Sequence, residues 1–267
     1  MAFDATKREK RGKSILALLA VRQHAGIPEL CRELGCSEST LRNDLRDMER
    51  HGLVKRVYGG VVPTGNSGQM LGMADRFPAF HREKLAIARH VVGKYVVPGQ
   101  TMFLDAGTTC AELARLVAEL PFRVNVLTNS LDAAHAIAAV DRHVLHLAGG
   151  RYDAMHGSFH DHDAMRYLET VHADVFFLCP AGVSVDAGFA GPDRAETELK
   201  RMMMRRARRV IALADHSKLN KTGFYSVCAL ADAEALVTDS HANPDEVKLL
   251  KDAGCLCELA PIDIPTP

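Results

Sequence analysis

The sequence predicts a two-domain α/β protein, in which a small three-helix domain precedes a larger domain with a mostly parallel sheet. The chain has 267 residues, which suits one small and one larger domain. Apolar residues have helical spacing over much of the first 50 residues, and from residue 101 short apolar runs alternate with helical segments. Such alternation is typical of a parallel sheet covered by helices on both faces.

Composition and charge narrow the class of protein. The chain is 47% hydrophobic and 25% charged, as in ordinary soluble proteins. Residues 1–60 carry 12 Lys+Arg against 8 Asp+Glu, and the rest carries 21 against 25. A net charge of +4 followed by −4 suits a nucleic-acid-binding domain joined to a different one.

The chain shows no targeting signal and no cysteine framework. No apolar run is as long as a membrane span, and the N-terminus is charged, unlike a signal peptide. The seven cysteines are scattered, and no pair has zinc-finger or thioredoxin spacing. We therefore expect a reduced, cytoplasmic protein with no membrane partner and no cofactor.

Three helices are predicted in the first 50 residues. Residues 7–21 have an apolar side and a basic start. Pro28 opens a second helix, because the missing N–H of proline costs nothing in the first turn. Gly35 lies in the following turn, and Ser37 is a good N-cap for a third helix over residues 38–50.

A short hairpin over residues 53–62 follows the third helix. Three helices, a tight turn and a hairpin describe a winged helix-turn-helix, whose third helix lies in the major groove of DNA. Arg42 and Asn43 would read base edges, because arginine pairs with guanine and asparagine with adenine. The residues expected to contact phosphates are Ser39, Thr40, Arg46, Lys55 and Arg56. The alternative is a small helical subdomain with a solvated charged face.

We expect the DNA-binding domain to span residues 1–62 and the second domain to span residues 81–267. Residues 63–80 between them are predicted to form a linker, because they are rich in residues that favour turns. In the second domain the predicted strands are residues 101–104, 124–128, 143–147, 174–178, 210–214, 236–238 and 255–259. The predicted helices are residues 81–94, 110–119, 131–139, 164–171, 194–208 and 244–253.

The segment from residue 101 to 109 predicts a strand, a loop of small residues and the start of a helix. A helix start offers unpaired backbone N–H groups and the positive end of the helix dipole. Gly107 permits close backbone approach, Thr108 and Thr109 add hydroxyl donors, and Asp105 would accept from sugar hydroxyls. The alternative is a tight turn with a threonine cap.

Five loops are predicted at the carboxyl ends of the strands, where ligands of parallel sheets bind. They cover residues 105–109, 128–130, 149–151, 181–182 and 215–218, and are rich in glycine and hydroxyl groups. Such loops suit a sugar phosphate, and the charge of Lys218 would pair with its phosphate. The expected effector-binding residues are Asp105, Gly107, Thr108, Thr109, Thr128, Asn129, Ser130, Gly149, Gly150 and Lys218.

Residues 37–45 and 53–60 resemble the DeoR family of bacterial sugar-catabolism regulators. That family usually has T-[IV]-R-R-D-L followed by a G-x-L-x-R-x-H-G-G-A wing, whereas this chain has Asn43 in place of the second arginine and Tyr58 in place of the histidine. The family strings D-A-G-T-T, T-N-S, L-x-G-G and A-D-H-S-K stand at residues 105–109, 128–130, 147–150 and 214–218.

The resemblance covers roughly residues 7–260. It implies a second domain similar in fold to ribose-5-phosphate isomerase A and the CoA-transferases. It also implies a repressor of a carbohydrate-catabolism operon, released from operator DNA by a phosphorylated sugar or a related metabolite. We expect a homo-oligomer, a dimer or a tetramer, because a two-fold dimer presents two recognition helices to a repeated site.

A competing hypothesis is a phosphosugar isomerase with an accessory DNA-binding head. Asp105, Lys218 and either Glu196 or Glu198 would supply its acid and base groups. We favour a regulator that is not an enzyme, because the head has a defined DNA-reading geometry and no complete catalytic arrangement is readable.

One stretch, residues 156–163, departs from the family pattern. It places His156, His160 and His162 at alternate positions with two aspartates, which suggests a metal. That spacing suits a strand or loop, and no distant further ligand is apparent in the sequence. We therefore expect no metal site, but an aspartate cap at a helix start with exposed histidines. An altered effector preference is a further option.

Overall fold

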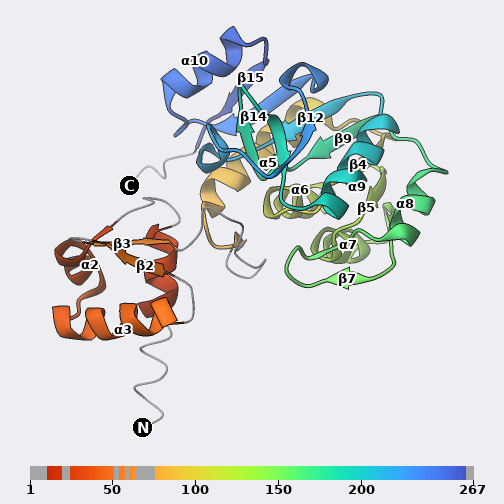
Figure 1. Ribbon diagram of the computed structural model, residues 1–267. Coiled ribbons are helices and arrows are strands. Elements are labelled where there is room, and N and C mark those ends of the chain that lie inside the picture. The colour runs from red at the N-terminus through yellow and green to blue at the C-terminus, as the bar shows by residue number, and fades with distance from the viewer. Residues whose placement is uncertain (1–10, 20–24, 51–53, 58–59, 64–75, 263–267) are drawn as a thin grey trace. The chain divides into compact units, whose positions relative to one another are not determined.

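The computed structural model describes residues 11–19, 25–50, 54–57, 60–63 and 76–262 (Figure 1). The chain forms two compact units, residues 1–69 and 70–267. The domain limits expected from the sequence stay a prediction, since most of the expected linker lies outside the described residues. No helix in the described part of the chain is both long and apolar enough to cross a membrane.

The first unit contains the predicted three helices and hairpin. A helix covers residues 11–19. The other elements are α2 (Ile27–Leu34), α3 (Glu38–Arg50), β2 (Val54–Val57) and β3 (Gly60–Pro63), with a two-residue strand β1 (Ala25–Gly26) paired antiparallel to β3. β1 was not predicted, because two residues carry no periodic pattern. The winged helix-turn-helix arrangement is confirmed.

The turn between α2 and α3 is fixed by local chemistry. Gly35 ends α2 in the left-handed conformation, with φ 59°, and its N–H donates to the carbonyl of Cys31. Ser37 Oγ accepts from the N–H of Thr40 at 3.3 Å, as expected of an N-cap. The apolar sides of the helices then meet in one core, which contains Ile15, Leu19, Leu30, Leu41, Leu45, Met48, Val54 and Val61.

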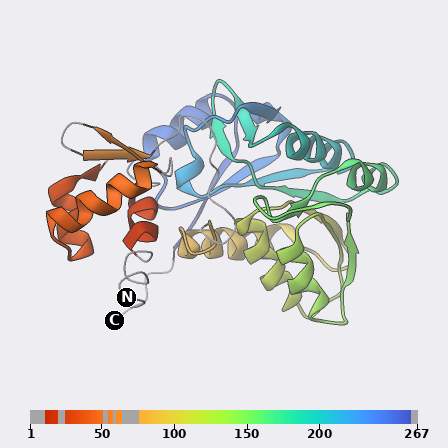
Figure 2. The same cartoon turned by 60° about the horizontal axis from the view of Figure 1, so that its bottom comes forward.

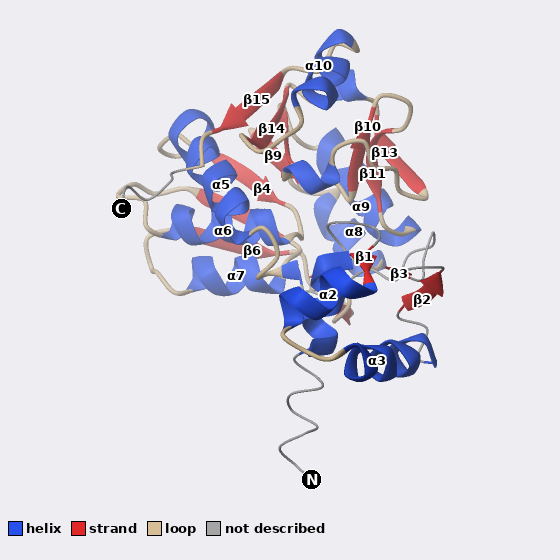
Figure 3. Cartoon of the chain, turned by 90° about the vertical axis from the view of Figure 1, so that its left-hand side faces the viewer, coloured by secondary structure: helices blue, strands red, loops and turns tan. Residues whose placement is uncertain are grey.

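The second unit is organised around a seven-stranded parallel sheet (Figure 3). Its strand order is β15-β14-β12-β9-β4-β5-β6, and every neighbouring pair is parallel. In chain order the strands are β4 (Thr101–Leu104), β5 (Asn125–Thr128), β6 (Val144–Leu147), β9 (Val175–Leu178), β12 (Val210–Leu213), β14 (Ala235–Asp239) and β15 (Cys257–Ala260).

Helices cover both faces of this sheet (Figure 2). One face carries α5 (His81–Tyr95), α6 (Thr108–Ala118) and α7 (Leu131–Ala138), and the other carries α8 (His162–Leu168), α9 (Arg194–Arg205) and α10 (Pro244–Asp252). Met102 and Leu104 of β4 pack with the first group, whereas Phe103 packs with the second. Both faces of the strand are therefore buried, which explains its continuous apolar sequence.

Short elements surround the main sheet and were not predicted. A small antiparallel sheet contains β10 (Gly182–Ser184), β11 (Gly188–Gly191) and β13 (Tyr225–Cys228), and a hairpin pairs β7 (Tyr152–Asp153) with β8 (Ser158–Phe159). Two 3-10 turns, η1 (His216–Lys218) and η2 (Leu230–Asp232), complete the unit. The predicted fold class, α/β with a mostly parallel sheet, is confirmed.

Candidate functional site

The outer face of α3 carries the residues expected to contact bases. Leu41 and Leu45 are fully buried in the core of the first unit. Arg42, Asn43 and Arg46, like Ser39, are exposed. The helix therefore separates a packing side from a polar side that is free to enter a groove.

Both expected base readers have partners within α3. Arg42 donates from Nε and Nη2 to Glu38 Oε1 at 2.8 and 2.6 Å, and Arg46 Nη1 donates to Asn43 Oδ1 at 3.3 Å. The side chains of Arg42 and Glu38 are 55% and 58% exposed. Exposed pairs one helical turn apart contribute only about 0.3–0.5 kcal/mol, so DNA can displace them readily.

The first strand of the wing, β2, is hydrogen-bonded to α3 through Arg56. Arg56 donates from its backbone N–H and from Nε to the carboxylate of Glu49 at 2.9 and 2.7 Å. At the helix start, Thr40 Oγ1 lies 2.8 Å from Ser37 Oγ. Lys55 is part of β2, but its side chain lies outside the described residues, as does the whole of Tyr58.

The five predicted loops leave the main sheet at one edge. They follow β4, β5, β6, β9 and β12, which are five neighbouring strands of one parallel sheet. The convergence expected from the sequence is therefore confirmed for the loops as a group. The chemistry of their individual side chains differs from the expectation in several places.

The Asp105 carboxylate lies in a buried ion pair and not at an open surface. Its Oδ2 accepts from Lys200 Nζ at 2.6 Å and from the N–H of Cys179 at 2.8 Å, and its Oδ1 accepts from the N–H of Ala106 at 2.8 Å. Lys200 Nζ also lies 2.8 Å from Glu196 Oε1. Asp105 and Lys200 are both 0% exposed. The expected direct contact of Asp105 with sugar hydroxyls does not fit this geometry, because its oxygens already have these partners.

Lys200 was missed by sequence reasoning. Burial lowers the pKa of Lys200, but Asp105 and Glu196 raise it by more, so its ammonium stays charged. The spacing of Glu196 and Lys200 could have indicated an ion pair, because it places the two side chains one turn apart on α9. Nothing in the sequence indicated that Asp105, 95 positions away, would join them.

The loop from Gly107 to Thr109 begins α6 close to the end of β9. A Cβ added to Gly107 would lie 2.7 Å from Cys179 Cβ, so the close approach requires glycine. Thr108 and Thr109 form the first turn of α6 and are 7% and 6% exposed. The first N–H groups of a helix and its positive dipole end favour an anion at this point.

The Thr128-Asn129-Ser130 loop uses two of its three side chains for structure. Thr128 Oγ1 donates to the carbonyl of Leu104 at 2.7 Å, and Ser130 caps α7 by accepting from the N–H of Ala133. Asn129 Nδ2 donates to the carbonyl of Phe159, while its Oδ1 is buried and has no hydrogen-bond partner among the described residues. Among the three side chains of this loop, that oxygen is the acceptor for which the described residues supply no donor.

Gly149 and Gly150 turn the chain after β6. Gly150 has φ 118°, and a Cβ there would lie 2.2 Å from Asp161 Oδ1. Asp161 accepts from the N–H of Arg151 and caps α8, and these bonds lower its pKa. Gly150 therefore serves the close packing of this loop against α8, whereas a Cβ at Gly149 would meet no atom of the described residues within 4 Å.

Three cationic residues, Lys84, Arg76 and Lys218, lie close enough for their charges to act on one another, and only Lys218 was predicted. Lys84 of α5 is 4% exposed and donates to the carbonyls of Arg76 and Ala79 at 2.5 and 2.6 Å. The pKa of Lys84 is lowered to about 8, mainly by burial; Asp215 opposes this shift, and the charges of Lys218 and Arg76 add to it. Lys218, which was predicted, is half-buried in η1.

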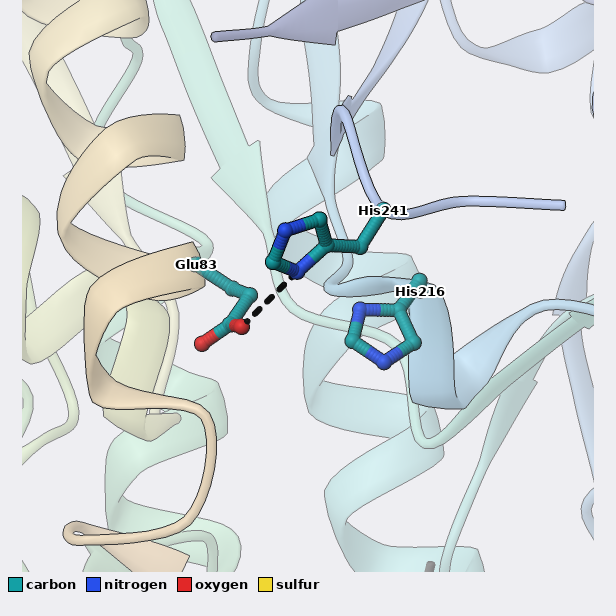
Figure 4. Close-up of side chains that lie close together, drawn as sticks. All are labelled: Glu83, His216 and His241. Carbon is teal, nitrogen blue, oxygen red and sulfur yellow. Dashed lines mark hydrogen bonds and ion pairs between the residues drawn. The ribbon is translucent and has the colours of Figure 1, made fainter. Parts of the chain in front are cut away.

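A group of two histidines and a glutamate lies beside this edge (Figure 4). Glu83 comes from α5, His216 from η1, and His241 follows β14. His241 Nδ1 lies 3.2 Å from Glu83 Oε1, and His216 Nδ1 lies 3.0 Å from Asp239 Oδ1. The bond to Asp239 raises the pKa of His216.

In residues 156–163 the expected aspartate cap is present, but two of the three histidines are not exposed. Asp161 caps α8 by accepting from the N–H groups of Asp163 and Ala164, and His162 is exposed, as predicted. His160 is 7% exposed, and the His156 side chain is 13% exposed, so the expectation of exposed histidines is wrong for these two.

Two family models match the chain, one in each unit. Residues 11–64 match the family model of the DeoR-like helix-turn-helix domain, and residues 79–240 match that of the DeoR C terminal sensor domain. A ribose 5-phosphate isomerase A structure from Methanocaldococcus jannaschii is similar at 19% identity, with a TM-score of 0.38 over 52% of this chain and 54% of that chain.

Three curated relatives match over nearly their whole length. The HTH-type transcriptional regulator GolR of Listeria innocua is 30% identical over 94% of this chain and 98% of its own. The transcriptional repressor AccR of Agrobacterium fabrum is 31% identical over 90% and 92%, and the putative aga operon transcriptional repressor of Escherichia coli O157:H7 is 26% identical over 93% and 93%.

All three relatives are regulators, which favours regulation over isomerisation for this chain. The two family models together account for both units of the structure. The chain belongs to the DeoR family of DNA-binding transcriptional regulators.

Proposed function

We infer that this regulator represses a carbohydrate-catabolism operon and leaves its operator when a phosphorylated sugar binds at the carboxyl edge of the parallel sheet. The inference rests on the family of the chain and on two complementary features of that edge. One end of the edge suits an anion, and the other offers an unused hydrogen-bond acceptor.

The positive end of the site supports a phosphate. The start of α6 supplies backbone N–H groups and a positive dipole end. Lys84 and Lys218 lie near enough to each other for the charge of Lys218 to lower the pKa of Lys84. Placing a dianionic phosphate beside these groups relieves their mutual repulsion, which is favourable for binding.

The single observation that carries the sugar part is the buried, unpartnered Oδ1 of Asn129. A buried acceptor left without a donor costs about 1–3 kcal/mol, so a ligand hydroxyl that donates to it gains that energy. Asn129 follows β5, the neighbour of β4, from which the α6 loop extends. A hydroxylated molecule with a phosphate at one end matches both groups.

Asp105 has a positioning role in this proposal. The Asp105–Lys200–Glu196 group joins the end of β4 to α9 and fixes the loop that begins α6. Gly150, Thr128 and Ser130 likewise shape the edge through close backbone packing and internal hydrogen bonds. The proposed ligand contacts are the α6 start with Thr108 and Thr109, together with Asn129 and Lys218.

In the first unit, Arg42 and Asn43 read base edges. Ser39, Thr40, Arg46, Lys55 and Arg56 hold the DNA backbone. A homodimer, or a tetramer built from dimers, presents two copies of α3 to a repeated operator. The effector releases DNA because it binds more tightly to the arrangement of units or subunits that cannot hold the operator.

A thermal-shift screen tests the proposal. Phosphorylated pentoses and hexoses are added to the full-length protein, each beside its unphosphorylated parent. A ligand specific to the folded state raises the unfolding temperature by an amount that grows with the ratio of its concentration to its Kd. We expect one phosphorylated sugar to stabilise wild type, and to stabilise the Asn129→Ala variant, which lacks the acceptor, markedly less. A panel in which no phosphorylated compound differs from its parent would contradict the proposal.

A further inference from the structure

Three side chains of the β7–β8 hairpin converge outside the proposed effector contacts. Asp153 ends β7, His156 lies in the following turn, and His160 comes directly after β8. One ligand atom from each of these residues lies within 4.8 Å of the other two. These atoms are two imidazole nitrogens and one carboxylate oxygen, a donor set typical of zinc and other divalent transition metals.

The spacing of these atoms matches a metal centre. His156 Nδ1 lies 3.3 Å from Asp153 Oδ1, and His160 Nε2 lies 3.8 Å from Asp153 Oδ2. Two ligands at about 2.1 Å from a tetrahedral zinc ion are about 3.4 Å apart. The hairpin therefore holds these donors at nearly the required separation.

The remaining nitrogen of each histidine has a neighbour of its own. His156 Nε2 lies 3.0 Å from Asp193 Oδ2 and 3.8 Å from Glu196 Oε2. His160 Nδ1 lies 3.1 Å from Ser158 Oγ. Metal-binding histidines commonly carry their proton on the nitrogen that faces such a partner, which leaves the other nitrogen available to the metal. Here the nitrogens left available are the two that face Asp153.

Two buried atoms of the cluster lack a hydrogen bond. Among the described residues, neither His156 Nδ1 nor Asp193 Oδ2 has a hydrogen-bond partner. Three carboxylates, from Asp153, Asp193 and Glu196, surround the half-buried His156. Glu196 is buried and pairs with Lys200, whereas the side chains of Asp153 and Asp193 are 32% and 34% exposed. A divalent cation at Nδ1 would lie among these three carboxylates and would satisfy the orphan nitrogen.

We propose that Asp153, His156 and His160 bind one Zn²⁺ ion, and that Asp193 and Glu196 orient His156 from its opposite side. The sequence predicts no metal site, because no distant further ligand is apparent in it. In the structure, two acidic residues from the start of α9, Asp193 and Glu196, lie beside His156 of the hairpin. The proposed metal site shares no residue with the proposed ligand contacts. Glu196, which orients His156 in this proposal, also pairs with Lys200.

The Glu83–His216–His241 group is the natural rival (Figure 4). In that group His241 already pairs with Glu83, and His216 Nδ1 already bonds to Asp239. No buried polar atom of these three side chains lacks a hydrogen bond, whereas His156 Nδ1 at the hairpin is such an atom. This difference favours the hairpin.

Equilibrium dialysis of the full-length protein against Zn²⁺, after treatment with a chelator and its removal, tests the proposal. We expect one zinc ion per chain in wild type. His156→Ala, His160→Ala and Asp153→Asn should each lose stoichiometric binding, and Asp193→Asn should bind about 10-fold or more weakly. His162→Ala is the matched control in the same stretch, His241→Ala tests the rival group, and both should bind as wild type does.

Co²⁺ used as a spectroscopic probe identifies the ligands. The proposal predicts visible d–d absorption without thiolate charge-transfer bands, and its loss in Asp153→Asn, a variant of nearly unchanged shape. Thermal unfolding without metal shows whether each variant is folded. Absence of zinc from wild type, thiolate bands, or loss of binding in His241→Ala with retention in His156→Ala would overturn the proposal.

Discussion

Replacing Arg42 by alanine removes an exposed side chain of α3 that we propose reads a base. A bidentate arginine–guanine contact contributes about 1–3 kcal/mol of discrimination. In the free protein Arg42 is paired with Glu38 across an exposed surface, and releasing that pair costs about 0.3–0.5 kcal/mol. The net loss on substitution is therefore about 0.5–2.7 kcal/mol, or roughly 2- to 100-fold in Kd.

The assay is fluorescence anisotropy on DNA selected by the wild-type protein from random sequences, compared with unrelated DNA at the same salt concentration. Arg42→Ala should weaken binding to the selected site far more than to unrelated DNA. Arg56→Ala, which removes an expected phosphate contact, should weaken both alike. If Arg42→Ala bound the selected site as tightly as wild type, the assignment of α3 as the reading helix would be wrong.

Three further outcomes follow from the sensor unit. Lys200→Met leaves Asp105 and Glu196 buried without their cation, so urea denaturation should show a loss of about 3–5 kcal/mol, and unchanged stability would refute the buried ion pair. Lys84 is charged below its folded pKa of about 8 and neutral above it, so calorimetry should show effector affinity falling as pH rises from 7 to 9. A flat profile, or the same fall in Lys84→Met, would contradict this. Lys218→Ala should retain operator binding but bind the effector at least 10-fold more weakly by calorimetry, a loss expected of a charged hydrogen bond. Equal affinity would remove Lys218 from the site.

The fold could be predicted because its signals are local. The Gly35 turn, the Ser37 cap and the apolar sides of the helices each follow from residues a few positions apart. The same is true of the main strands, whose apolar runs reflect burial on both faces. The short strands β1, β7 and β8 were missed because two-residue pairs are set by tertiary contacts and leave no period.

The site could be predicted only as a set of loops. Parallel strands place their carboxyl ends together, so the common edge follows from topology alone. Which side chain faces a ligand depends on partners far away in the chain, such as Lys200 for Asp105. The pairing of His156 with Asp193 was invisible for the same reason. Spacing along the chain cannot report contacts that only the folded sheet creates.

The most direct test of the regulatory mechanism is the release of DNA by a phosphorylated sugar. Wild-type protein bound to its selected, labelled DNA is titrated with the stabilising compound and, separately, with the same sugar lacking its phosphate. We predict that the phosphorylated compound dissociates the complex at concentrations at which the parent sugar leaves it intact. If a compound saturated the sensor unit while the affinity of the protein for its selected DNA stayed constant, the proposed mechanism of release would be wrong.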